Sequence, residues 1–179
     1  FFTDRGVLYQ VKAHELPALK VKDKGVPLDN LSKFEGSKEQ ILMVCPMSSL
    51  AGRTLLFATG QAMVKLVPGE ELITANRAVA ATKLLEGDWL TVVRDPGEET
   101  DVVLQTQKGV FLKFALAEIP MLKKNSRGVR GMKLDDGDIL EHVYLPGADG
   151  VIQYKEKEVH LNRLKSAKRD GKGTPVQKR

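Results

Sequence analysis

The chain has 179 residues, of which 42% are hydrophobic and 28% charged, and its formal net charge is +5. This composition can form a core, and the length fits one domain or a small array of similar units. No apolar run could span a bilayer, no signal-peptide pattern opens the chain, and a single cysteine, Cys45, excludes a disulfide framework. A cytosolic protein without a membrane partner is therefore expected, with Cys45 packed in an apolar strand.

The first 50 residues are predicted to open with a hairpin. Phe1 and Phe2 belong to an apolar strand, Asp4-Arg5-Gly6 makes a turn, and Val7–Lys12 returns. Because a natural terminus seldom starts inside a strand, the sequence is expected to be a fragment. A further strand is predicted over Gln40–Val44.

Between these strands, lysines alternate with other residues from position 20 to position 24. In an extended segment, period-two spacing puts the ammonium groups of Lys20, Lys22 and Lys24 on one side. Residues 51–98 repeat the plan with weaker charge, and Arg77 and Lys83 are their loop cations. Trp89 opens a predicted strand and is interpreted as a core residue rather than a base-stacking platform.

Residues 99–145 contain the most informative stretch, Asn125–Leu134. It combines the cations Arg127, Arg130 and Lys133 with two glycines. Glycine permits close backbone approach or positive φ, and Arg and Lys supply charge for phosphate. In residues 146–179, Leu161–Lys168 could form a short helix, but strand and loop are favoured by analogy with the preceding segments.

The same arrangement recurs along the chain, which is the sign of a repeat. A hairpin-like segment precedes a glycine- or alanine-bearing loop, and an acidic turn follows the second and third loops. The hairpins are Phe1–Tyr9, Leu55–Lys65, Val103–Lys113 and Val151–Leu161, and the loops are Gly25–Leu31, Ala78–Leu84, Gly128–Leu134 and Gly173–Arg179.

The spacing of the repeat predicts the fold. Leu31, Leu84 and Leu134 are 53 and 50 positions apart. A period near 50 suits blades of four short strands, as in propeller-type folds. We therefore predict an all-β domain over residues 1–179, with approximate repeats 1–50, 51–98, 99–145 and 146–179.

Charge is segregated along this repeat. Residues 108–133 carry seven cations and one anion, and residues 150–179 carry nine cations and three anions. Residues 134–149 carry five anions and no cation, and residues 86–101 carry six anions and one cation. If equivalent positions share one face, the protein has a basic rim, which is typical of nucleic-acid binding.

No constellation for catalysis is present. The three histidines lack metal-ligand spacing, and no phosphate loop or nucleophile–base pattern occurs. Asp135, Asp136 and Asp138 could suggest calcium, but a β-turn is favoured because the acidic connector recurs. The chain is not expected to catalyse a reaction alone.

Several of these motifs resemble blades of the C-terminal domain of the A subunit of bacterial type IIA topoisomerases, the family of DNA gyrase and topoisomerase IV. The similar stretches are Phe2–Lys12 followed by His14–Pro17, Lys24–Leu31 and Arg127–Leu134. The resemblance spans nearly the whole chain. It implies a β-pinwheel, a propeller-like disc with a basic outer edge that binds and bends duplex DNA.

Two departures from this family matter. The catalytic tyrosine region is absent, because Tyr9, Tyr144 and Tyr154 lie in predicted blade strands. The box that defines gyrase, Gln-Arg-Arg-Gly-Gly-Lys-Gly, has no intact copy; the nearest match, Lys168–Gly173, has Asp170 in place of a glycine. A topoisomerase-IV-like protein is favoured, with gyrase as the alternative. Lys168–Gly173 is interpreted as a degenerate box, or alternatively as a frayed basic tail.

The resemblance implies a non-catalytic DNA-wrapping module of an ATP-hydrolysing enzyme in the bacterial cytoplasm, associated with the nucleoid. No cofactor is expected in this domain; Mg²⁺ and ATP would serve the parent enzyme, with ATP on a partner B subunit that meets a missing N-terminal part. The alternative is a propeller-type protein-interaction module with a basic rim. The predicted DNA-binding residues are Lys20, Lys22, Lys24, Lys65, Arg77, Lys123, Lys124, Arg127, Arg130, Lys133, Lys165, Lys168, Arg169 and Lys172.

Overall fold

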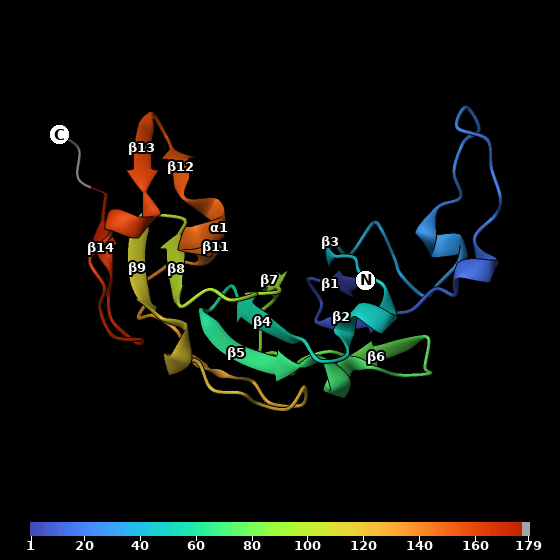
Figure 1. Ribbon diagram of the computed structural model, residues 1–179, viewed down its shortest axis with the longest axis horizontal. Helices are drawn as coiled ribbons and strands as arrows, with labels where there is room; N and C mark the ends of the chain where they lie inside the picture. Colours follow the sequence, from blue (N-terminus) through green and yellow to red (C-terminus); the bar gives the residue numbers. More distant parts are fainter. Residues whose placement is uncertain (177–179) are drawn as a thin grey trace.

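The protein consists mainly of short antiparallel strands, which the computed structural model describes for residues 1–176 (Figure 1). Three four-stranded sheets and one two-stranded hairpin follow one another along the chain. The all-β fold with four-stranded blades, predicted from the period of the repeat, is confirmed. The last residues of the fourth loop copy, 177–179, lie outside the described residues.

Each blade is a sheet of four adjacent strands. From one edge to the other, the first blade consists of β3 (Ile41–Met43), β1 (Phe2–Thr3), β2 (Val7–Tyr9) and β6 (Ala78–Ala80). The second consists of β7 (Leu90–Arg94), β4 (Thr54–Thr59), β5 (Met63–Pro68) and β10 (Val129–Arg130). The third consists of β11 (Leu140–Tyr144), β8 (Asp101–Thr106), β9 (Val110–Ala115) and β14 (Thr174–Pro175). The separate hairpin pairs β12 (Val151–Tyr154) with β13 (Lys157–His160).

The final strand of each blade comes from the following repeat. β6 pairs with β2, β10 pairs with β5, and β14 pairs with β9, all antiparallel. Each of these strands lies in one copy of the repeated loop. Consecutive repeats are therefore interlocked by backbone hydrogen bonds. The corresponding segment of the first repeat, Gly25-Val26-Pro27, pairs with no strand among the described residues.

The central strands are mainly apolar, and both of their faces are buried. Side chains alternate along a strand, so β4 points Leu55 and Phe57 one way and Leu56 and Ala58 the other. The first pair joins the hydrophobic cluster that includes Phe2 of the first blade. The second pair joins the cluster shared with the third blade. Each blade thus packs face to face with its neighbour.

The helical elements are short connectors. They are the 3₁₀ turns η1 (Ala13–Glu15), η2 (Leu28–Asn30), η3 (Met47–Leu50), η4 (Gly69–Leu72), η5 (Leu116–Glu118) and η6 (Leu161–Arg163), and the α-helix α1 (Pro146–Asp149). No helix among the described residues is long and apolar enough to cross a membrane. The prediction of strand and loop for residues 161–168 is wrong at its start, because this segment begins with one 3₁₀ turn.

The three blades lie side by side in a curved row (Figure 1). The strands β3, β7 and β11 form the inner edge, and β7 contacts both of the others. The strands β6, β10 and β14 form the outer edge. Because the exchanged strands occupy the outer edge, all three repeated loops that supply them lie on one side of the protein.

One predicted strand is wrong. Residues 20–24 do not extend, because the chain reverses there: Asp23 N–H donates to Lys20 O at 2.9 Å, and Lys20 N–H donates to the Asp23 carboxylate at 2.8 Å. The ammonium groups of Lys20, Lys22 and Lys24 consequently do not line one side of a strand. An aspartate three residues after a backbone N–H favours such a turn, and this signal outweighs period-two spacing.

The acidic connectors are turns, as predicted. Asp88 accepts hydrogen bonds from Gln61 N–H and Trp89 N–H, and Asp138 accepts from Lys108 N–H and Ile139 N–H. Each carboxylate thus accepts a hydrogen bond from a backbone N–H in the turn of the neighbouring hairpin. This repeated role explains why the acidic sequence recurs with the same period.

The remaining interpretations of Trp89 and Cys45 also concern packing. Trp89 is half-buried and its ring lies on Gly60, where an added Cβ would meet ring carbons at 2.5 Å. Cys45 is half-buried and packs against the cluster between the first and second blades. Both residues therefore contribute to packing at the first two blades.

Candidate nucleic-acid interface

The outer edge forms a basic surface that we call the outer rim, defined as residues 77–84, 123–134 and 163–175. Each segment contains one exchanged strand. Together they carry twelve Lys or Arg residues and one carboxylate, Asp170. They contain no Phe, Tyr, Trp or His. The rim therefore offers charge for phosphates but no aromatic ring on which a base could stack.

The three segments of the rim connect to one another. Between the first and second blades, Thr82 Oγ1 donates to Ser126 O at 3.5 Å. Between the second and third, Asp170 N–H donates to Gly131 O at 2.7 Å and Lys133 N–H donates to Gly171 O at 2.8 Å. These bonds make the outer rim a continuous band that follows the curvature of the blades.

Ten of the fourteen predicted site residues lie on the outer rim. They are Arg77, Lys123, Lys124, Arg127, Arg130, Lys133, Lys165, Lys168, Arg169 and Lys172. The rim also contains Lys83 and Arg163, which the site prediction omitted. Lys83 could have been found from the sequence, because it occupies the position of Lys133 in the second copy of the loop.

Lys65 was predicted to contact DNA, and this prediction is wrong. Lys65 lies within β5, and its side chain is 2% exposed. The ammonium group lies beneath the rim, where it donates to Lys123 O at 3.2 Å, Lys124 O at 2.8 Å and Ser126 O at 2.8 Å. Lys65 therefore positions the rim loop instead of facing outward.

The third blade uses a lysine in a similar way. Lys113 of β9 is 8% exposed, and its ammonium donates to Asn162 O at 3.1 Å, just before the rim segment of that blade. In the first blade, Tyr9 takes the place of Lys65 in the ladder, because Tyr9 lies opposite Phe1 as Lys65 lies opposite Phe57; the Tyr9 hydroxyl donates to Glu39 at 2.8 Å. Lysine anchors thus support the two most basic parts of the rim.

Lys65 predicts a measurable pH dependence of stability. Burial lowers the pKa of Lys65 from 10.5 to about 8. Between these values the unfolded chain holds a proton that the folded chain has lost, so stability rises with pH. From pH 8 to pH 10, we expect the free energy of unfolding of the wild type to increase by about 2 kcal/mol relative to that of Lys65→Met, as measured by urea denaturation.

The control for this experiment is Lys38→Met, which removes an exposed ammonium. It should leave the wild-type pH slope unchanged. If the free energies of unfolding of wild type and Lys65→Met change in parallel with pH, burial does not lower the pKa of Lys65.

Three arginines of the rim already have partners within the protein. Arg77 forms a bidentate ion pair with Glu15, and Arg130 forms one with Asp170. Arg169 donates from Nε to Glu118 O at 3.0 Å and from Nη1 to Arg130 O at 2.6 Å. In the described part of the chain, Arg127, Lys133, Lys168 and Lys172 form no salt bridge, so their charges face solvent.

These ion pairs shift the pKa values of their members. The hydrogen bond from Arg77 lowers the pKa of Glu15, and the hydrogen bond from Arg130 lowers the pKa of Asp170. The same pairing raises the pKa of Arg130. Both carboxylates are therefore ionised at neutral pH, and each partly neutralises the rim where it lies.

The remaining predicted residues, Lys20, Lys22 and Lys24, are exposed but lie away from the outer rim. They belong to the segment between η1 and β3 that projects from the first blade (Figure 1). The segment that follows them does not pair as a blade strand. The structure thus separates them from the main basic surface.

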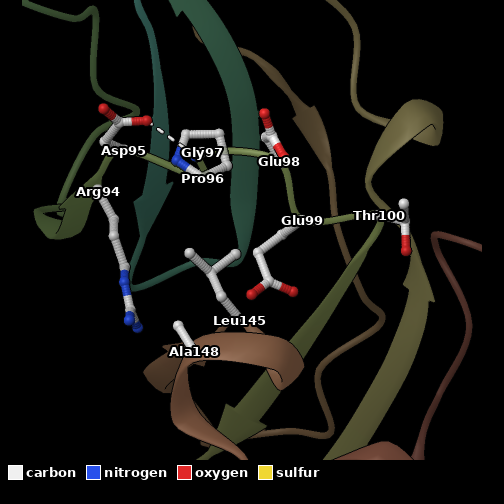
Figure 2. Close-up of a pocket in the computed structure, with 9 residues that line it drawn as sticks. All are labelled: Arg94, Asp95, Pro96, Gly97, Glu98, Glu99, Thr100, Leu145 and Ala148. Carbon is white, nitrogen blue, oxygen red and sulfur yellow. Dashed lines mark hydrogen bonds between the residues drawn. The ribbon is translucent and has the colours of Figure 1, made fainter.

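One pocket away from the rim has the opposite charge. Figure 2 shows the pocket at the linker between the second and third blades, whose lining includes the carboxylates of Asp95, Glu98 and Glu99. The one cation there, Arg94, forms a bidentate pair with Asp149 at 2.6 and 2.9 Å. A phosphate backbone would be repelled at this pocket and attracted to the outer rim.

Comparison with known proteins places this architecture in a family. The sequence matches the family described as DNA gyrase C-terminal domain, beta-propeller, over residues 1–33, 53–94 and 100–146. These matched segments cover more than half of the chain. The chain belongs to this family. The resemblance inferred from the sequence motifs is therefore confirmed.

Curated relatives of this family show how much of a longer protein the chain represents. It is 31% identical over 155 residues to the A subunit of DNA gyrase from Escherichia coli (strain K12), covering 84% of the chain and 17% of the relative. It is 28% identical over 183 residues to the A subunit of DNA gyrase from Staphylococcus aureus (strain NCTC 8325 / PS 47), covering 97% and 20%. The chain thus spans about a fifth or less of each relative.

Solved structures agree on the fold. The crystal structure of the C-terminal domain of DNA topoisomerase IV has a TM-score of 0.85 at 23% identity, covering 98% of this chain and 57% of that one. The DNA gyrase A C-terminal domain has a TM-score of 0.69 at 20% identity, with coverage of 96% and 57%. Both belong to the gyrase and topoisomerase IV group that the sequence motifs indicated.

Proposed function

We propose that the outer rim binds double-stranded DNA and bends it around the blades, as a non-catalytic module of the A subunit of a type II topoisomerase. The observation that carries this proposal is the distribution of charge: twelve cations and one carboxylate lie on a continuous curved band. Regularly placed cations on a convex band complement the phosphates of a duplex that follows the curve.

The chemistry of the rim favours duplex over single-stranded DNA. Proteins that bind single strands commonly stack bases on aromatic rings, and the rim segments have none. Lys and Arg at exposed positions contact phosphates without reading base edges, so affinity should depend little on sequence. The bending energy would be offset by the additional phosphate contacts that a curved duplex makes.

Within the parent enzyme, this module would hold a duplex near the site of strand passage. The Mg²⁺ and ATP that drive such a reaction would be bound by other parts of the enzyme, with ATP on a B subunit. That partner would meet the A subunit outside the present chain. The enzyme would act on the chromosome in the bacterial cytoplasm.

The proposal is tested by measuring the affinity for a fluorescent duplex of about 40 base pairs as salt is raised. We expect log K to fall linearly with log salt, with a slope of roughly −4 to −8, equivalent to about 5 to 9 phosphates. Unrelated duplex sequences should give the same affinity. Absence of binding at low salt would exclude the proposal and favour a rim that binds an acidic protein.

A further inference from the structure

Asp170 is the one carboxylate in the three segments of the outer rim. Every other charged residue of these segments is a Lys or Arg, twelve in total. Asp170 also lies at the junction where the rim segments of the second and third blades meet. This single anion lowers the positive charge of the rim at that junction.

The Asp170 carboxylate binds Arg130 in the way that a phosphate group would, by accepting two hydrogen bonds from one guanidinium. Its Oδ1 accepts from Nε of Arg130, and its Oδ2 accepts from Nη2 of Arg130 at 3.0 Å. Arginine uses the same planar, bidentate geometry for carboxylates and for phosphate oxygens. Arg130 is 54% exposed and Asp170 is 35% exposed, so an incoming phosphate can reach this pair.

The backbone holds Asp170 in this place. Its φ is +67°, and its N–H donates to Gly131 O at 2.7 Å. On either side, Lys133 N–H donates to Gly171 O at 2.8 Å, and Arg169 N–H donates to Glu118 Oε2 at 2.9 Å. The segment is therefore docked between the second and third blades, in contrast to the frayed tail that the sequence left open as an alternative. The ion pair results from a fixed position and not from an occasional contact.

We propose that Asp170 is an internal competitor of DNA phosphate at Arg130, which lowers the affinity of the rim at this junction. This inference rests on the proposed function of the rim. A phosphate that reaches Arg130 must displace the carboxylate and also meets its charge. Exposed ion pairs are weak, so DNA can displace Asp170, but at a reduced affinity.

The proposal is tested with Asp170→Asn, because asparagine has the same shape and tolerates positive φ. We expect the Kd for duplex DNA to fall about 3- to 10-fold at low salt. The slope of log K against log salt should become steeper by about 0.9, because one more phosphate is neutralised. The matched control is Asp149→Asn, which removes an equal charge from another bidentate Arg–Asp pair on the inner side. It should change the Kd less than twofold and leave the slope unaltered.

A second pair of variants separates masking of Arg130 from a general charge effect. Arg130→Gln alone should weaken binding little, because its guanidinium is already occupied. In the Asp170→Asn background, the same change should remove the whole gain in affinity. Asp170→Gly, which also suits φ of +67°, repeats the test if asparagine lowers the melting temperature.

The outcomes distinguish this inference from the proposed function. If wild type binds duplex DNA but Asp170→Asn matches Asp149→Asn in both Kd and slope, the role of Asp170 is excluded and DNA binding stands. Binding by Asp170→Asn where wild type binds weakly supports the inference. If neither protein binds at low salt, both the proposed function and the inference fail.

Discussion

Gly128→Ala is expected to lower the unfolding free energy by about 3 kcal/mol and to separate β10 from β5. Gly128 has φ of +86°, and a Cβ at this position would lie 2.6 Å from Val64 O. The obstacle is a backbone atom of β5, so no side-chain rotation can relieve it. The exchanged strand must therefore shift, and with it the rim loop that Lys65 anchors. Urea denaturation measures this loss.

Gly52→Ala separates the two causes of this effect. Gly52 also has a positive φ, +71°, but a Cβ there would meet nothing within 4 Å. The free energy of unfolding of this variant should fall by only about 1 kcal/mol, which is the cost of placing alanine at a positive φ. Equal losses for the two variants would mean that close approach of the backbones does not hold β10 in place.

Replacing three exposed cations of the second rim segment should weaken DNA binding most. For Lys123→Gln, Arg127→Gln and Lys133→Gln together, we expect affinity to fall about 10- to 100-fold near 0.1 M salt. The salt slope should decrease by about 3, at roughly 0.9 for each phosphate that is no longer neutralised. Because these side chains contact phosphates, the loss should be equal for unrelated duplex sequences. Fluorescence anisotropy across a salt series measures all three effects.

The matched control removes three cations that lie outside the three segments of the outer rim. Arg5 and Lys38 interact before β3, and Arg53 forms an ion pair with Asp95 after β7. Their combined replacement by Gln changes net charge equally but should alter affinity less than threefold. A loss as large as that of the rim variant would mean that net charge, not rim geometry, determines binding. A loss confined to one duplex sequence would instead indicate base contacts.

Much of the fold could be predicted because the repeat makes each local signal appear several times. Leu31, Leu84 and Leu134 set the period, and the hairpin turns before them are marked by glycine. The exchange of strands between repeats could not be predicted. β10 is two residues long, and its partner Val64 lies far from Val129 in sequence. A strand this short has no periodicity that could indicate its partner.

The site was predicted more reliably in its charge than in its contacts. Ten of the twelve rim cations were predicted, because clusters of Lys and Arg are visible in the sequence. Burial of an ammonium is not visible from the residue type, because a lysine in a strand is usually exposed, whereas Lys65 is buried within β5. Its burial depends on three carbonyl groups from residues 123–126 that come from the next repeat. The pairing of Arg130 with Asp170 likewise joins residues of two repeats.

Chemical modification of lysines with and without DNA tests the central claim most directly. A duplex bound along the outer rim should reduce the reactivity of Lys133, Lys168 and Lys172 severalfold, as measured by mass spectrometry. Lys38 should keep its reactivity, because it lies outside the three rim segments and interacts with Glu35 and Arg5. Equal protection of Lys38 and the rim lysines, or protection of Lys38 alone, would contradict DNA binding along the outer rim.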